Sequence, residues 1–183
     1  VKNVREGDRV GVRLSHRQYA IARTSDLYRI PDGVSDEDAT WFHLATIVQN
    51  GIRRAEHQLG DAVAVIGLGL LGQLVVQYVR LQGSREIIAI DVAERRLEMV
   101  RTHGATTTLA MVPDAAREYI LGLTEGAGVN VVYDVTGAAA VFASAQRLLR
   151  NFGRLILLGD TGTPASQHLT SDVITRGLRI IGA

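Results

Sequence analysis

Short, mostly apolar runs alternate with segments of helical periodicity from residue 61 to the end of the chain. The runs are rich in β-branched residues and cover residues 62–66, 86–91, 106–110, 129–135, 153–159 and 178–183. Segments with helical spacing lie between them, at residues 71–83, 93–104, 113–126, 138–151 and 171–177. Buried parallel strands are apolar on both faces, and helices connect them across the sheet. The pattern therefore predicts an α/β fold with a doubly wound parallel sheet of six strands.

The first sixty residues follow a different pattern. Residues 7–14 and 18–25 alternate apolar and polar positions, and both stretches are predicted to be strands. A Pro-Asp-Gly turn then leads to Ser35, the predicted N-cap of a helix that begins with three acidic residues. This helix is predicted to continue to Gly60, with a candidate break near Gly51.

Composition and charge narrow the function. The chain of 183 residues is 46% hydrophobic and 21% charged, which is ordinary for a globular protein. Its net charge of +1 gives no reason to expect nucleic acid or a membrane as partner. It has no cysteine, so it forms no disulfide and offers no thiolate to zinc. We see neither a membrane-spanning run nor a signal peptide, and we expect a cytoplasmic protein of which this chain is a piece.

Three glycines, Gly67, Gly69 and Gly72, stand between the first of these apolar runs and the helical segment after it. The spacing is weak evidence alone. It indicates a dinucleotide site when it follows a strand, opens a helix and has an acid about 20 residues further on. Asp91 meets that last condition, nineteen positions after Gly72 (91 − 72). In such a site the first glycine permits a sharp turn, the second lets a pyrophosphate approach the backbone, and the third lets the helix pack closely. The N–H groups near Leu70 would then attract the anionic pyrophosphate.

Asp91 also favours one cofactor over another. A carboxylate at this place accepts hydrogen bonds from ribose hydroxyls and repels a 2′-phosphate. Arg95 and Arg96 count against that preference, since a nearby arginine can receive a 2′-phosphate. We expect NAD, with NADP less favoured.

Several longer stretches point to a family. They are GDRV, QYAIARTSDLYRIPDGVSDEDA, AVIGLGLLGQLVVQYVRLQG, IIAIDVAERRLEMVRTHGA, GVNVVYDVTG and GRLILLG. As a set they resemble the medium-chain dehydrogenase/reductase superfamily, in particular its zinc-type alcohol and polyol dehydrogenases. The resemblance implies that residues 1–45 are the end of an incomplete GroES-like catalytic domain, a partial β segment with its linking helix. It implies that residues 46–183 are an NAD(P)-binding Rossmann domain.

The resemblance also assigns the cofactor-binding positions. Thr46 would lie beside the nicotinamide, and Asp91 would bind the adenosine ribose with Arg96 beside it. The remaining positions form a phosphate loop and two strand exits: Gly67, Leu68, Gly69, Leu70, Leu71 and Gly72; Val135, Thr136 and Gly137 along the cofactor; Leu158, Gly159 and Ile181 near the nicotinamide carboxamide.

Zinc is the point at which the chain departs from that family pattern. Zinc-dependent members carry a Glu or Cys ligand just before the segment that corresponds to HLAT, and here Phe42 stands in that place. We therefore expect no metal site in this chain, and zinc in a longer protein stays open. No catalytic residue is assigned, and the candidate is His43, which could protonate a bound carbonyl or alkoxide.

The resemblance implies an NAD-dependent oxidoreductase that transfers hydride between nicotinamide and an alcohol or carbonyl substrate. By itself this part would bind cofactor and lack most of the catalytic apparatus. One alternative is a zinc-independent, NADPH-dependent enoyl or quinone reductase, and another is a nucleotide-sensing domain without turnover. The last strand, at residues 178–183, would be an apolar edge, and in this family it pairs across a dimer axis, so we expect a homodimer.

Overall fold

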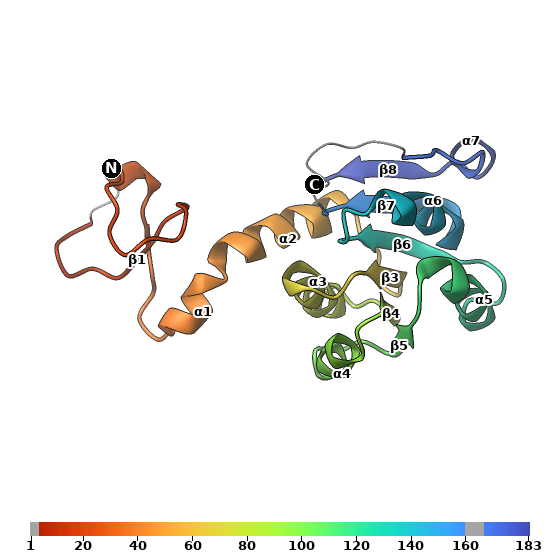
Figure 1. The fold of residues 1–183 in the computed structure, drawn as a ribbon, viewed down its shortest axis with the longest axis horizontal. Helices are drawn as coiled ribbons and strands as arrows, with labels where there is room; N and C mark the ends of the chain where they lie inside the picture. The colour runs from red at the N-terminus through yellow and green to blue at the C-terminus, as the bar shows by residue number, and fades with distance from the viewer. Residues whose placement is uncertain (1–3, 160–166) are drawn as a thin grey trace. The chain divides into compact units, whose positions relative to one another are not determined.

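The computed structural model describes residues 4–159 and 167–183. They fall into two compact units that meet in the sequence between Thr46 and Ile47, and each unit is described by itself. Figure 1 shows the order of the helices and strands. The domain identities predicted for the two stretches stay predictions.

The first unit contains little regular structure before its helices. Strand β1 (Val10–Gly11) pairs antiparallel with β2 (Tyr28–Arg29), and a single turn, η1 (Thr24–Asp26), precedes β2. The predicted strand at residues 18–25 is wrong, and that at 7–14 is reduced to β1. Tyr19 and Ile21 are 82% and 101% exposed, so the apolar positions of this alternation have no buried face to pack on.

The helical segment after the turn begins as predicted and breaks elsewhere. Ser35 caps α1 (Asp36–Thr40), and its hydroxyl accepts a hydrogen bond of 3.0 Å from the N–H of Asp38. The break falls at Trp41, and α2 (Phe42–Arg54) follows. Gly51 is not a break, because it lies inside α2, where an added Cβ would come within 3.1 Å of Leu158 Cδ1. Glycine at this position lets α2 pack closely against Leu158.

The second unit is built on one parallel sheet of six strands, which confirms the predicted fold class. The strands are β3 (Ala62–Ile66), β4 (Glu86–Asp91), β5 (Thr107–Ala110), β6 (Val129–Asp134), β7 (Leu149–Leu157) and β8 (Arg179–Gly182). Their spatial order is β5-β4-β3-β6-β7-β8, and all neighbours run parallel. The order reverses at β3, where Ile66 pairs with Ile90 on one side and with Asp134 on the other. Ligands bind at such a switch point, outside the carboxyl ends of the strands.

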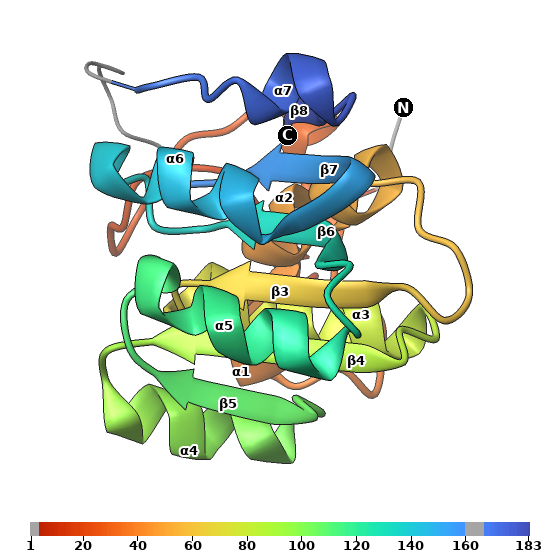
Figure 2. The ribbon, with the colours of Figure 1, turned by 90° about the vertical axis from the view of Figure 1, so that its right-hand side faces the viewer.

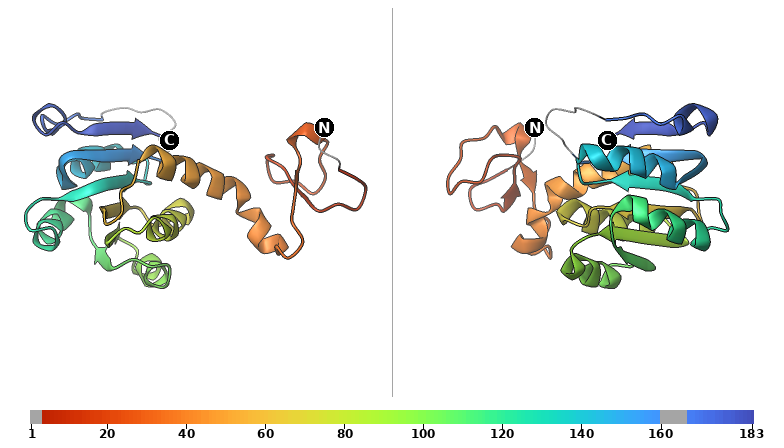
Figure 3. Two further views of the ribbon diagram at one scale, coloured as in Figure 1. Left: turned by 180° about the vertical axis from the view of Figure 1, so that it is seen from behind. Right: turned by 45° about the vertical axis from the view of Figure 1, so that its right-hand side comes forward.

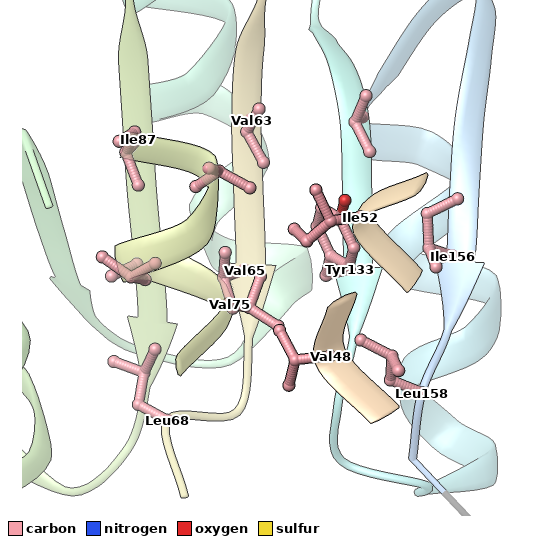
Figure 4. Packing of buried hydrophobic residues seen from close by; sticks show 14 of the residues in the cluster. Val48, Ile52, Val63, Val65, Leu68, Val75, Ile87, Tyr133, Ile156 and Leu158 are labelled. Atoms are coloured by element: carbon pink, nitrogen blue, oxygen red, sulfur yellow. The ribbon is translucent and has the colours of Figure 1, made fainter. Parts of the chain in front are cut away.

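Helices cover both faces of this sheet (Figures 2 and 3). The residues of α2 from Ile47 onward lie on one face, together with α3 (Leu70–Leu81) and α4 (Glu94–Thr102); α5 (Pro113–Leu123) and α6 (Ala139–Leu148) lie on the other. The short α7 (Asp172–Thr175) precedes β8. Alternate residues of each strand face opposite cores, so Val63 and Val65 join the first cluster while Ala64 and Ile66 join the second. Figure 4 shows the first cluster, with Val48 and Ile52 of α2 near Tyr133 and Leu158.

The junction of α6 and β7 differs from the prediction. The helix was expected to continue to residue 151, and it ends at Leu148 because Leu149 already pairs with Val129 in the sheet. The register then shifts, so that Val131 pairs with Arg154, and Phe152 has a φ of +60° within the irregular stretch.

A buried polar network connects the segment between α2 and β3 to side chains of β6 and β7. The Arg154 guanidinium lies 2.9 Å from Asp61 Oδ2 and also donates to the carbonyl of Ala55 at 2.7 Å. His57 Nε2 lies 2.7 Å from the hydroxyl of Tyr133. Burial is the main cause that lowers the pKa of His57; Arg154 lowers it further, against the opposing effect of Asp61. His57 is therefore neutral here near pH 7.

Within the described residues, no helix combines the length and the apolar character needed to cross a bilayer.

Candidate cofactor-binding site

A crevice of about 400 Å³ lies at the carboxyl ends of β3, β4 and β6. This volume falls in the range of small-molecule and cofactor sites. Its walls come from the loops that leave these strands and from the segment between β5 and α5: Ile66, Gly67, Gly69, Ile90, Asp91, Val92, Arg96, Met111, Val112, Pro113, Val135, Thr136, Ala138 and Val141. The crevice is therefore built where the strand order reverses.

Two of the three loop glycines are required by the fold. Gly67 has a φ of +87°, and an added Cβ there would lie 2.7 Å from Thr136 Cγ2. A Cβ on Gly72 would lie 2.0 Å from the carbonyl oxygen of Gly67. Backbone atoms cannot yield as a side chain can, so Gly72 permits the close contact between α3 and the turn.

Gly69 is different, because nothing among the described residues calls for glycine there. Its φ of −70° suits any residue, and a Cβ added to it would meet no atom of the described residues within 4 Å. It is the N-cap of α3, and without a side chain it makes no capping hydrogen bond to the first turn. The backbone N–H groups at a helix N-terminus attract anions, and open space above them admits one. The start of α3 is therefore open to an anion.

Asp91 ends β4 with its carboxylate beside that loop. Oδ2 accepts a hydrogen bond of 2.7 Å from the N–H of Leu68, and Oδ1 accepts one of 2.8 Å from the N–H of Ala93. Arg96 Nη1 lies 3.4 Å from Oδ2. Burial on its own raises the pKa of Asp91, but the two backbone N–H groups and the Arg96 charge outweigh it and hold this pKa below the usual value. The carboxylate is therefore ionised at neutral pH, with lone pairs left to accept further hydrogen bonds.

The opposite wall begins where β6 ends. Asp134 Oδ1 accepts hydrogen bonds from the N–H and the hydroxyl of Thr136, at 3.0 and 2.7 Å, which fixes the turn after the strand. Burial is the main cause that raises the pKa of Asp134. Gly137 has a φ of +65°, and a Cβ on Gly159 would lie 2.1 Å from its nitrogen. The segments that leave β6 and β7 therefore touch backbone to backbone.

The structure brings six of the predicted site residues to the crevice: Gly67, Gly69, Asp91, Arg96, Val135 and Thr136. Others lie in the same loops without lining it: Leu68 is buried beneath the turn, Leu70 is exposed, and Leu71, Gly72 and Gly137 are their neighbours. Leu158, Gly159 and Ile181 lie at the carboxyl ends of β7 and β8. Whether any of these residues binds a cofactor stays a prediction.

Sequence reasoning missed the apolar wall and one buried polar side chain. Met111, Val112 and Pro113 follow β5, and their place after a strand in a parallel sheet was the available signal, since all carboxyl ends share one edge. Gln73, in the first part of α3, is buried and hydrogen-bonds to the backbone of the loop. No spacing in the sequence marks it.

The other two candidates lie in the first unit. Thr46 is exposed, and its hydroxyl donates to the carbonyl of Phe42 at 2.7 Å, so its role beside the nicotinamide stays a prediction. The His43 ring lies 6.3 Å from that of Phe42, centroid to centroid. Phe42 itself packs on Tyr28, with 5.8 Å between ring centroids.

In the part of the chain that the structure describes, the available donors do not form a zinc site. Among residues 4–159 and 167–183, no three His, Asp or Glu side chains come together in a way that could hold a metal ion. We therefore assign no step of the chemistry to zinc in this chain.

The strand order, the glycine turn and the crevice define a Rossmann-type α/β domain. Residues 71–183 match the model of the zinc-binding dehydrogenase family, and the chain belongs to that family. This confirms the resemblance on which the sequence analysis relied.

Individual relatives agree. Over 92% of its length the chain is 31% identical to YphC, an uncharacterized zinc-type alcohol dehydrogenase-like protein of Escherichia coli (strain K12), and it covers 48% of that protein. It is 30% identical to sorbitol dehydrogenase of Bacillus subtilis (strain 168), over 78% of this chain and 40% of that one. The solved structure of zinc dependent alcohol dehydrogenase 2 from Streptococcus pneumonia superposes with a TM-score of 0.79 at 27% identity, over 86% of this chain and 46% of that one. The chain spans less than half the length of these relatives.

Proposed function

We propose that this chain is the cofactor-binding part of an NAD-dependent oxidoreductase of the alcohol or polyol dehydrogenase type. Such an enzyme transfers hydride between nicotinamide and an alcohol or carbonyl substrate. The observation that carries the proposal is the open space over Gly69, at the start of α3, with the Asp91 carboxylate beside it. The similarity to sorbitol dehydrogenase and to an L-threonine 3-dehydrogenase, 32% identical over 67% of this chain, supports the substrate class.

Different parts of the chain would bind different parts of the dinucleotide. The N–H groups at the start of α3 would bind the pyrophosphate, and Asp91 would accept hydrogen bonds from the adenosine ribose. The apolar wall at Met111 to Pro113 would pack against the adenine. When bound, the nicotinamide would accept hydride from an alcohol or donate it to a carbonyl, and the backbone after β6 and β7 would orient its ring.

The choice of NAD over NADP rests on charge. Asp91 is ionised at neutral pH, because two backbone N–H groups and Arg96 hold its pKa low. A 2′-phosphate placed against it would be repelled. Arg96 lies 3.4 Å from the same carboxylate, so its charge is already partly balanced within the protein. The relatives found give no support to the alternative enoyl or quinone reductase function.

A fluorescence titration tests the proposal. We expect the full-length protein to enhance and shift the emission of NADH with saturation in the micromolar range, and NADPH to bind at least tenfold more weakly. Equal or tighter binding of NADPH would contradict the choice of cofactor. No binding of either nucleotide would contradict the function.

The proposal includes a homodimer and a cytoplasmic location. Strand β8 ends the sheet and pairs with β7 alone among the described strands, so its outer edge offers unpaired backbone groups to a second copy. Sedimentation velocity of the full-length protein would test the dimer, and a fluorescent fusion would test the location.

A further inference from the structure

The backbone of Leu68, in the phosphate loop, is held by side chains on both of its polar groups. Its N–H donates to Asp91 Oδ2 at 2.7 Å, and its carbonyl accepts a hydrogen bond of 3.1 Å from Gln73 Nε2. Its own side chain is 1% exposed. The residue just before Gly69 is therefore fixed by strand β4 on one side, by helix α3 on the other, and by the core.

Gln73 makes this contact as part of a fully paired amide. Its Nε2 also donates to the carbonyl of Arg96 at 3.0 Å, so both amide hydrogens are used on backbone oxygens. Its Oε1 lies 2.8 Å from His103 Nδ1. Carbonyl oxygens only accept, so the amide nitrogen must face them, and His103 must carry its hydrogen on Nδ1. The side chain is buried, where an unpaired amide would be costly.

The geometry of the peptide bond between Leu68 and Gly69 determines where the Gly69 N–H points. The bond between Leu68 and Gly69 is trans, so its C=O and its N–H point to opposite sides. Because Gln73 draws the carbonyl of Leu68 toward α3, the N–H of Gly69 points the other way. Gly69 lines the crevice, and this N–H is the type of donor that a pyrophosphate uses.

We propose that Gln73 is a positioning residue for the cofactor: it aims the Gly69 N–H at the pyrophosphate and ties the loop to the helix that carries Arg96. His103 fixes the orientation of the Gln73 amide. This inference rests on the proposed function, because it gives the pyrophosphate its place over Gly69.

The test compares Gln73→Met with Gln77→Met in the full-length protein. Methionine keeps the length of glutamine and removes its hydrogen bonds. Gln77 is the matched control: it lies one turn further along α3, and among the described residues its Nε2 hydrogen-bonds to the Gln73 backbone carbonyl alone, at 3.3 Å. Three ligands are titrated into each variant: NADH, ADP-ribose and adenosine. The first two contain the pyrophosphate and the third does not.

We expect Gln73→Met to raise the dissociation constants of NADH and ADP-ribose about tenfold. The variant loses the hydrogen bonds that hold the loop in its binding conformation, so a smaller fraction of the protein is ready to bind. Adenosine should change less than threefold, and Gln77→Met should change none of the three beyond twofold. An equal loss for all three ligands would overturn the inference, because it would show general damage. Binding of NADH within twofold of the parent would also overturn it.

His103 supplies a second test that does not depend on the folding of Gln73→Met. His103→Leu should weaken NADH about threefold, and His103→Asn should restore it, because an asparagine amide nitrogen can take the place of Nδ1–H. Equal affinities of these two variants would overturn the role given to His103. If the parent protein binds no NADH, the proposed function fails and the inference fails with it. If the parent binds and the Gln73 variant is unchanged, this inference alone fails.

Discussion

Replacing Gly69 by valine separates what the fold needs from what the ligand needs. An added Cβ meets no atom of residues 4–159 or 167–183 within 4 Å, and the φ of −70° is open to any residue. Gly69→Val loses an acceptable N-cap, which destabilises the fold by roughly 1 kcal/mol. The stiffer side chain also reduces the conformational entropy of the unfolded chain, which stabilises the fold by a comparable amount, about 0.4–1 kcal/mol. The net change in unfolding free energy should stay within about 1 kcal/mol, which shifts the Tm by roughly 2–4 °C at this size.

The effect on cofactor binding should be far larger. The valine side chain would occupy the space over the start of α3 and displace the pyrophosphate from the backbone N–H groups. Hydrogen bonds to a charged group contribute about 1.5–3 kcal/mol each, so the loss of two would weaken NADH on the order of 100-fold or more.

Gly72→Ala is the matched comparison. Its Cβ would lie 2.0 Å from the Gly67 carbonyl oxygen, so backbone must move. Overpacking of this kind costs about 1–3 kcal/mol, and it also deforms the turn. We expect this variant to lose both stability and binding.

The assay measures thermal unfolding and NADH fluorescence on all three proteins. If Gly69→Val binds NADH with the parent affinity, the pyrophosphate does not lie over residue 69. If its Tm falls as far as that of Gly72→Ala, the fold itself requires glycine there, and the space over the loop is no evidence for a ligand.

Three further variants test the remaining assignments. Asp91→Asn should weaken NADH at least tenfold and NADPH much less, because it removes a charged acceptor; an unchanged ratio of the two dissociation constants would refute the reading of the ribose. His57→Gln should flatten the dependence of stability on pH: the folded protein holds the His57 pKa below that of the unfolded chain, so stability is full above about pH 6.5 and falls below it, by at most about 1.4 kcal/mol per pH unit. Urea unfolding at pH 7.5 and 5.5 measures this, and an equal loss in parent and variant would refute it. Asp61→Asn leaves Arg154, whose side chain is 11% exposed, without its carboxylate, and should cost about 3–5 kcal/mol in the same assay; a loss below 1 kcal/mol would show that the pair is solvated.

The sheet could be predicted from the sequence because its strands are buried on both faces. Runs such as residues 62–66 have no polar position, so length and neighbouring helices identify them without knowledge of their contacts. The alternation at residues 18–25 failed as a strand signal, since an alternating segment forms a strand only where a partner and a buried face exist. An alternating sequence pattern alone provides neither the partner strand nor the buried face.

The candidate site was predictable in part for a related reason. Gly67, Gly72 and Asp91 act through backbone conformation and chain position, which a motif records. The Gln73 amide is held by His103, thirty residues away, and that contact depends on how α3 and α4 pack. Side-chain contacts between helices leave no spacing in the sequence.

The close approach of Gly137 and Gly159 limits how this protein can change. No side chain fits at position 159, since its first carbon would lie 2.1 Å from the Gly137 nitrogen. Neither segment can be rerouted without the other, so a library built to alter cofactor preference would return only glycine at 159. Positions around Asp91 and the apolar wall are free of this constraint, and they lie where the adenosine is proposed to bind.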